Sequence, residues 1–226
     1  MVKIRKASRT LFGGKIAGAV HRLNSRHPWN HNEAFHAWIT TRLPAQRGQA
    51  LDVGCGRGEL LALLAEHFDH VHGIDTDAGM QQASQSRCAG LTNVTVDSVK
   101  LDNIPAGSDL VSIVAVLHHL DLQMALEQVR RILNPSGRFL CVGLAPPDSL
   151  TDHMWDVASM VTNPIIGYIR HPWAAEHQPD ASPVPMREPQ LTFEQIRTTV
   201  QEVLPGAEMR HHLGFRHTIE WTKPGP

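Results

Sequence analysis

Cysteine is scarce in this 226-residue sequence. The three cysteines, Cys55, Cys88 and Cys141, are odd in number and show no C-x-x-C spacing. This pattern disfavours a disulfide framework and a structural zinc site, and we expect a reduced protein in the cytoplasm. We also expect no metal centre, because the adjacent pair His211-His212 falls in a predicted strand, where neighbouring side chains point to opposite faces.

Long apolar runs are missing as well. No stretch reaches the roughly 20 apolar residues that a membrane-spanning helix needs, and the run Leu11–Val20 is interrupted by Lys15. No small-residue cleavage site follows a long apolar core, so this run does not resemble a signal peptide. The sequence therefore predicts no membrane span.

Acidic residues are absent from the first 27 positions. This segment holds seven of the 21 Lys and Arg residues, so the remainder carries 14 basic and 22 acidic side chains, a formal net charge of −8. An acidic body disfavours a broad nucleic-acid surface. The basic segment could bind phosphate or an anionic membrane surface, or be a solvated terminus. We divide the chain into a basic extension, residues 1–28, and one domain, residues 29–226.

Strand and helix patterns alternate through the first two thirds of that domain. Strands are expected at Ala50–Val53, His70–Ile74, Asn93–Val96, Asp109–Leu117 and Arg138–Leu144. Helices are expected over Asn30–Leu43, over Glu59–His67, from an N-cap at Asp77 to Cys88, and over Leu122–Leu133. Regular alternation predicts a parallel sheet with helices on both faces.

The alternation breaks after Leu144. Eight of the 15 prolines fall within residues 145–190, where we expect an insertion with a short helix near Asp152–Val161. A helix is predicted next, followed by two strands joined at Gly214 that pair antiparallel; these elements are Thr192–Val203, Ala207–Leu213 and His217–Thr222. The predicted fold is a doubly wound α/β sheet of seven strands, mostly parallel, with an antiparallel C-terminal edge strand.

A glycine-rich loop, Leu51–Gly58, follows the first predicted strand of this sheet. Its sequence is L-D-V-G-C-G-R-G, and glycines in such a loop let the backbone approach a ligand closely. Acids stand at three strand ends: Asp52, Asp75 and Asp97. Asp75 comes 23 residues after Asp52, about where a ribose-binding acid belongs. Because ligands bind at the carboxyl ends of parallel strands, the three acids are expected to face one crevice.

The loop sequence allows two other interpretations. Its glycines and acids could serve only as turns and helix caps. A nicotinamide dinucleotide enzyme would show G-x-G-x-x-G, which places a pyrophosphate on the helix N-terminus. The present spacing is G-x-G-x-G, preceded by Asp52. A carboxylate there would repel a pyrophosphate and attract a ligand that carries an ammonium and a sulfonium, which favours methyl transfer over hydride transfer.

The segment Leu51–Gly58 resembles motif I of the class I S-adenosylmethionine (SAM)-dependent methyltransferases. The similarity covers about residues 48–144 and continues through Gly73–Asp75, Val96-Asp97, Asp109–Leu120 and Leu133–Leu140. The sequence is similar to the large group that includes the ubiquinone-type methyltransferases. The resemblance implies a Rossmann-like fold and SAM as the cofactor.

The resemblance also implies which residues bind the cofactor. Asp52, Gly54, Cys55 and Gly56 would surround the methionine part of SAM, together with Ala115 at the end of the fourth strand. Asp75, followed by Thr76, would hold the ribose hydroxyls. Asp97 would accept from the adenine amino group, with the Ser98 backbone beside the ring. Trp29, before the first helix, would cover the cofactor or simply pack against the domain.

Three histidines are candidate catalytic residues. His118 and His119 follow the fourth strand and are expected to face the crevice, and His31 could reach the polar end of the cofactor. A histidine can take a proton near neutral pH, although the H-H-L segment could serve positioning alone.

The predicted function is methyl transfer from SAM to a small-molecule acceptor. The segment Val114–His119 lacks the N/D-P-P-Y/F sequence typical of enzymes that methylate amino groups of nucleic acids, and it lacks the Pro-Cys nucleophile of pyrimidine C5 enzymes. Nucleic acid is therefore disfavoured as a partner. An RNA methyltransferase and a non-catalytic SAM-fold scaffold remain alternatives, and neither the acceptor atom nor the oligomeric state follows from the sequence.

Overall fold

A seven-stranded sheet runs through the part of the chain that the computed structural model describes, which is residues 35–147, 189–212 and 216–225. The strand order is β3-β2-β1-β4-β5-β7-β6. The strands are β1 (Gln49–Val53), β2 (His70–Ile74), β3 (Val94–Asp97), β4 (Ser108–Val114), β5 (Leu133–Gly143), β6 (Glu208–His212) and β7 (Arg216–Thr222). β1 to β5 are parallel, while β7 pairs antiparallel with both β5 and β6.

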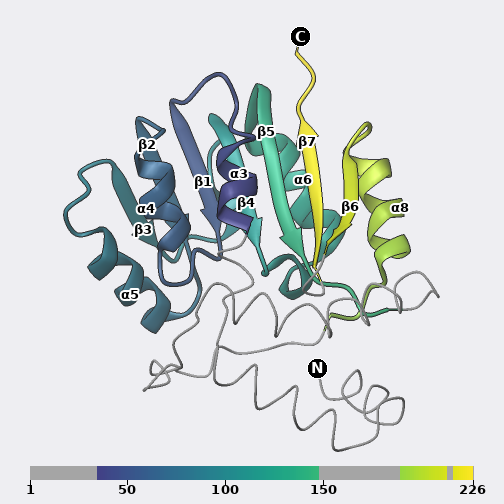
Figure 1. The fold of residues 1–226 in the computed structure, drawn as a ribbon, viewed down its shortest axis with the longest axis horizontal. Coiled ribbons are helices and arrows are strands. Elements are labelled where there is room, and N and C mark those ends of the chain that lie inside the picture. Colours follow the sequence, from purple (N-terminus) through teal and green to yellow (C-terminus); the bar gives the residue numbers. More distant parts are fainter. Residues whose placement is uncertain (1–34, 148–188, 213–215, 226) are drawn as a thin grey trace, which may run out of the picture.

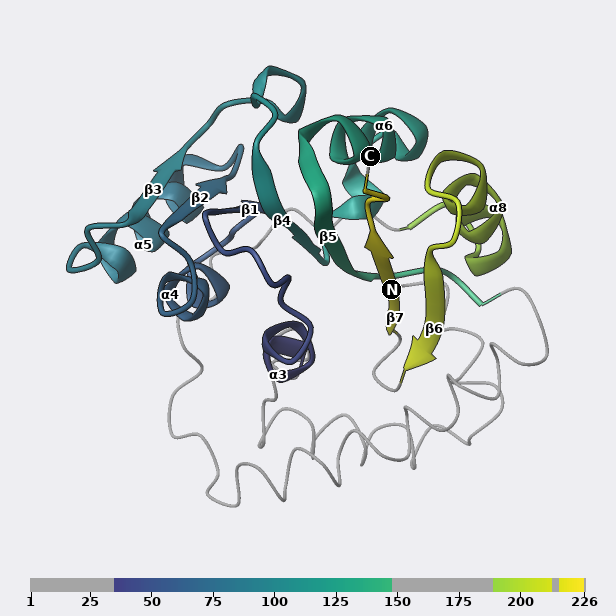
Figure 2. The same cartoon turned by 90° about the horizontal axis from the view of Figure 1, so that it is seen from above.

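Helices cover both faces of the sheet (Figures 1 and 2). On one face lie α3 (His36–Thr40), α4 (Glu59–Ala65) and α5 (Ala78–Cys88), and on the other α6 (Leu122–Ile132) and α8 (Phe193–Val203). Two short 3₁₀ helices, η2 (Leu101–Asn103) and η3 (Leu117–His119), flank β4. The predicted doubly wound, mostly parallel α/β fold is confirmed.

Alternating burial along the central strands explains this layering. In β4, Val111 and Ile113 pack against α6 and α8, whereas Leu110 packs toward α4. In β1, Val53 packs into the core on the α6 and α8 side, and Ala50 packs into the core on the α4 side. Successive side chains of a strand point to opposite faces, so a continuous apolar strand sequence serves two cores at once.

Polar caps fix where the long helices begin. The Asp77 carboxylate accepts a hydrogen bond from the Met80 N–H at 2.9 Å, which confirms the predicted cap of α5. Thr192 and Gln195 form a reciprocal capping box at the start of α8. Such caps satisfy backbone N–H groups that the first helical turn leaves without partners.

Three predicted boundaries were wrong by three residues or more. β4 ends at Val114 rather than Leu117, because Ala115 adopts a left-handed conformation, with φ +58°, that turns the chain. β5 begins at Leu133 rather than Arg138 and takes in the predicted turn, since its pairing with β4 shifts register there. The described part of the first helix is shorter than predicted, since α3 ends at Thr40 instead of continuing toward Pro44.

The C-terminal strands have an order that refines the prediction. The antiparallel C-terminal strand is β7, and it lies one position inside the sheet, between β5 and β6. The edge itself is β6. The basic extension, the insertion from residue 148 to 188 and its expected helix near Asp152–Val161 lie outside the described residues.

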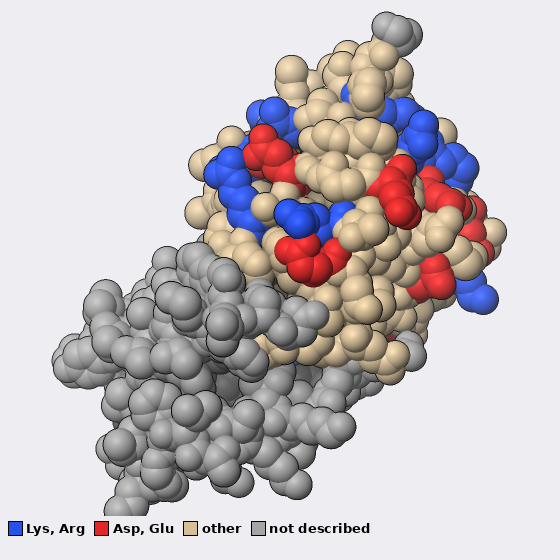
Figure 3. All heavy atoms as spheres, turned by 90° about the vertical axis from the view of Figure 1, so that its right-hand side faces the viewer, with Lys and Arg blue, Asp and Glu red and all other residues tan. Residues whose placement is uncertain are grey.

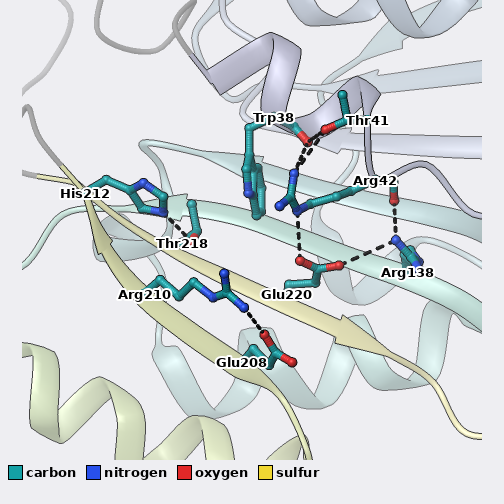
Figure 4. A network of polar contacts seen from close by, with 9 residues as sticks. All are labelled: Trp38, Thr41, Arg42, Arg138, Glu208, Arg210, His212, Thr218 and Glu220. Carbon is teal, nitrogen blue, oxygen red and sulfur yellow. Dashed lines mark hydrogen bonds and ion pairs between the residues drawn. The ribbon is translucent and has the colours of Figure 1, made fainter.

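A polar network holds α3 against the second half of the sheet (Figure 4). Arg42 Nε donates to Glu220 of β7 at 3.1 Å, and Arg138 of β5 donates to the Arg42 carbonyl at 2.9 Å. The Arg42 guanidinium also lies 5.0 Å from the Trp38 ring centroid. A polar groove of about 620 Å³ adjoins this network, toward the amino end of β6 and away from the glycine loop.

None of the described helices is long and apolar enough to cross a bilayer.

Candidate functional site

The glycine loop joins β1 to α4 and turns sharply on residues with positive φ. Gly54 has φ +71°, and a Cβ there would lie 2.3 Å from a methyl carbon of Val116, so this position is closed by packing. Gly56 has φ +56°, and a Cβ there would meet nothing within 4 Å. The backbone at Gly56 therefore borders open space that a ligand can enter, as the sequence predicts for a glycine of this loop.

Asp75 follows β2 and closes onto the same loop. Its Oδ2 accepts from the Gly56 N–H and its Oδ1 from the Asp77 N–H, both at 2.9 Å. Each carboxylate oxygen can accept a further hydrogen bond, and the side chain stays half-buried beside the exposed Thr76. Asp75 is thus held next to the open side of Gly56.

Asp52 is the last but one residue of β1 and is only 3% exposed. The Ser112 hydroxyl of β4 donates to its Oδ1 at 2.7 Å. Burial raises the pKa of Asp52 to about 7; the Ser112 hydrogen bond acts in the opposite direction, and the charge of Asp75 adds to the rise. A positively charged group placed near this carboxyl would favour its ionised form.

Asp97 ends β3, and both of its oxygens are engaged. Oδ1 accepts from the Val99 N–H at 2.8 Å, and Oδ2 lies 2.9 Å from Nε2 of His72 on β2. The Asp97 side chain is still 44% exposed, and Ser98 beside it is exposed. The structure brings Asp52, Asp75 and Asp97 to the carboxyl ends of three adjacent strands.

Cys55 does not present its side chain to this edge. The thiol is buried, lies 4.0 Å from the Ser84 hydroxyl and packs beneath Gly73. Burial, with the nearby charge of Asp52, raises the pKa of Cys55 to about 12, so the sulfur stays protonated. Its N–H donates to the Ile74 carbonyl. Sequence reasoning placed Cys55 at the cofactor, and the structure shows its thiol directed into the core.

The end of β4 lies beside the glycine loop. Ala115 turns the chain and donates its N–H to the Val142 carbonyl at 2.7 Å, and Val116 then packs on Gly54. η3 follows at once and carries His118 and His119, whose ring centroids are 4.1 Å apart. Both histidines are half-buried. Trp29 and His31 lie outside the described residues.

His217 is a residue that the sequence analysis missed. It is 3% exposed, lies opposite Gly143 at the carboxyl end of β5, and its ring occupies the space that a side chain at Gly143 would fill. Phe193 stands edge-on to it at 5.6 Å. Within the described chain its Nε2 has no hydrogen-bond partner. The only signal in the sequence was a histidine at the start of a predicted strand.

The surroundings of His217 keep its imidazole neutral. Burial lowers the pKa of His217 to about 3, and the neighbouring His211, Arg216, His212 and His118 contribute further. Among the described residues, no group of three histidines, cysteines or acids is arranged to hold a metal ion.

Comparisons with known proteins agree with this geometry. The methyltransferase domain family matches residues 51–141. An uncharacterised methyltransferase of Mycobacterium tuberculosis is 32% identical over 202 residues, covering 87% of this chain and 98% of the relative. A demethylmenaquinone methyltransferase of Staphylococcus epidermidis is 26% identical over 140 residues, covering 58% of each protein.

A solved structure shows the same fold. A SAM-dependent methyltransferase from Aquifex aeolicus aligns with a TM-score of 0.55 at 17% identity, covering 91% of this chain and 97% of that one. SAM also fits the residues present: the open backbone at Gly56 offers room, and the strand-end carboxylates offer acceptors for its ribose and amino groups and negative charge for its sulfonium. The chain belongs to the class I SAM-dependent methyltransferases.

Proposed function

We propose that this methyltransferase acts on a small-molecule acceptor that approaches from the side of η3, β5 and β7. The observation that carries the proposal is the character of that side. Its described groups are half-buried or buried imidazoles beside apolar residues, His118, His119 and His217 among them. Small-molecule sites combine apolar walls with a few convergent polar groups.

We propose that the cofactor lies across the carboxyl ends of β1 to β3. Asp75 would bind the ribose hydroxyls through its remaining lone pairs, and Asp97 the adenine amino group beside Ser98. Asp52 would compensate the positive charges of the methionine part, near Gly54, Gly56 and Ala115. Cys55 would contribute through the free lone pair of its backbone carbonyl, because its N–H already donates to Ile74, and Thr76 would contribute through its hydroxyl. When bound, SAM supplies an electrophilic methyl group on a sulfonium, which is a good leaving group.

The chain's own residues supply alignment and a proton acceptor. Orientation of two reactants can be worth roughly 7–11 kcal/mol, and the fixed loop, with Asp75 bonded to Gly56, provides a rigid base for it. We assign His119 as the base for an oxygen or nitrogen acceptor, with His118 packed against it. His31 remains a second candidate, and Trp29 a candidate cover for the cofactor. A carbon acceptor would need no base.

Two other functions were predicted from the sequence as alternatives. An RNA methyltransferase needs a basic surface, whereas the face of the described body seen in Figure 3 carries acidic and basic side chains interspersed. A non-catalytic scaffold would not need the open backbone at Gly56 with a carboxylate bonded beside it. We also propose a cytoplasmic location, which the three free, buried cysteines support.

Methyl transfer from labelled SAM tests this proposal. Purified protein is incubated with methyl-labelled SAM and with separate small-molecule, RNA and protein fractions of a cell lysate, and Asp75→Ala serves as the inactive control. We expect label in the small-molecule fraction. Label in RNA alone would overturn the acceptor class, and no transfer together with no calorimetric binding of S-adenosylhomocysteine would favour the scaffold. We expect NAD not to bind.

A further inference from the structure

His72 is a half-buried histidine on β2 whose contact the cofactor assignment does not explain. Its side chain is 18% exposed, and its Nε2 lies 2.9 Å from Oδ2 of Asp97. A carboxylate can only accept hydrogen bonds, so the shared proton sits on Nε2 of the imidazole. The histidine therefore donates to Asp97.

Sheet geometry places the two side chains on one face. Ile74 is opposite Asp97 in the β2–β3 ladder, and His72 is opposite Thr95. His72 and Asp97 are thus diagonal neighbours across adjacent strands, within reach of a long side chain. The contact follows from the register and needs no movement of either strand.

The Asp97 carboxylate is fixed at both oxygens. Val99 donates its backbone N–H to Oδ1 at 2.8 Å while His72 engages Oδ2. The Asp97 backbone is held as well, because the Asp75 N–H donates to its carbonyl at 3.1 Å. A carboxylate with two fixed donors keeps one orientation, and its unused lone pairs point in set directions from a side chain that is 44% exposed.

We propose that His72 is a positioning residue for nucleobase selection: it holds Asp97 so that the carboxylate accepts a hydrogen bond from the 6-amino group of the cofactor's adenine. This inference rests on the proposed contact between Asp97 and adenine. Without His72, Oδ2 loses its donor, and the carboxylate can turn toward solvent. The enzyme then loses its preference for a base that bears an amino group, while the rest of the cofactor is still bound.

A purely structural role would give a different result. The contact between His72 and Asp97, whose side chain is 44% exposed, is expected to contribute little to stability. A general loosening of β2 and β3 would weaken every cofactor analogue equally. The discriminating measurement is therefore a ratio of affinities. It compares S-adenosylhomocysteine with its analogue in which purine replaces adenine, which lacks only the 6-amino group and keeps the ring nitrogen N1 as an acceptor.

Isothermal titration calorimetry of both ligands tests the proposal on the full chain. We expect the wild type to bind S-adenosylhomocysteine at least about tenfold more tightly, as a hydrogen bond to a charged acceptor predicts. His72→Leu should reduce this preference to less than about threefold and leave the affinity for the purine analogue within about twofold. His72→Gln, whose amide can donate from a similar position, should restore the preference.

His70→Leu is the matched control, because His70 is an exposed histidine at the other end of the same strand; it should leave both affinities unchanged. Equal weakening of both ligands by His72→Leu would overturn the positioning role. A wild type without preference would overturn it too, while binding of S-adenosylhomocysteine would still support the proposed function. A wild type that binds neither ligand would overturn the proposed function and this inference together.

Discussion

The two halves of the sheet end in opposite chemistry. In the first half, β1, β2 and β3 bring Asp52, Asp75 and Asp97 to their carboxyl ends, and each carboxylate accepts at least one hydrogen bond from the chain. In the second half, the equivalent edge carries His217 of β7 and His211 of β6, with Phe193 stacked on His211 at 3.8 Å. Acids end the strands of the first half, whereas histidines and Arg216 stand at the equivalent edge of the second.

This difference matches the two partners of a methyl transfer. The cofactor carries positive charge and ribose hydroxyls, for which carboxylates are suitable acceptors. The second half offers neutral imidazole, since His217 with its pKa near 3 stays uncharged at physiological pH. A neutral imidazole beside apolar residues, with the guanidinium of Arg216 next to it, suits a small-molecule acceptor. The comparison therefore predicts that substitutions in the two halves affect different kinetic quantities.

The largest expected effect lies at the end of β4, where the two halves meet. His119→Gln should lower kcat by about 10²-fold or more for an oxygen or nitrogen acceptor, because a positioned base contributes about 10²–10⁴-fold. SAM affinity should stay within about threefold, since no cofactor contact is removed. The measurement is steady-state kinetics with the acceptor found by labelling, alongside calorimetry.

His67→Gln is the control for this substitution, because His67 is an exposed histidine just after α4. An unchanged kcat in His119→Gln would contradict the base assignment and point to a carbon acceptor. A loss of both turnover and SAM affinity would instead show that His119 contributes to cofactor binding.

A somewhat smaller effect is expected at the end of β2, in the half of the sheet that we propose to bind the cofactor. Asp75→Ala should weaken SAM binding by about 2–4 kcal/mol, or roughly 30- to 1,000-fold, if two charge-assisted hydrogen bonds to the ribose are lost. The loop also loses its bond from the Gly56 N–H. Calorimetric titration measures the loss, with Asp69→Ala as control, because Asp69 is an exposed acid just before the same strand. An affinity change below twofold would show that Asp75 does not bind the ribose.

The sequence predicted the first half of the sheet, β1 to β3, better than the second half, for physical reasons. Glycines and acids at strand ends are local signals, and the Asp77 cap and the sheet followed from local patterns. The direction of the Cys55 thiol was not readable, because it depends on how closely α4 approaches Gly73. The end of β4 was missed, since Leu117 continues the apolar run although it is buried in η3 rather than in the strand.

Long-range pairing limits prediction in the second half. The position of β7 between β5 and β6 depends on contacts between segments that are far apart in the sequence. His217 takes its meaning from that pairing alone, because only the register with β5 places it over Gly143. Alternation of apolar and polar residues along a strand shows that one of its faces is buried. It does not show which strand lies beside it or which residues of that strand it contacts.

The smallest expected effect is the pH dependence of SAM binding. The buried Asp52 has a pKa of about 7, raised mainly by desolvation, and its ionised form is the one that favours a cationic ligand. SAM affinity should therefore rise by about tenfold between pH 6 and pH 8 as this carboxyl loses its proton, with proton release on binding near pH 7. Asp52→Asn should show neither feature. The ligand's own amino group titrates in both proteins, so the difference between the two pH curves reports Asp52 alone.

Ser112→Ala should move the midpoint of this pH dependence upward, because the Ser112 hydrogen bond lowers the pKa of Asp52. Calorimetry in buffers of different ionisation enthalpy measures the SAM affinity and the proton release of all three proteins. A wild-type pH curve that coincides with that of Asp52→Asn would show that the Asp52 carboxylate does not contribute to SAM binding.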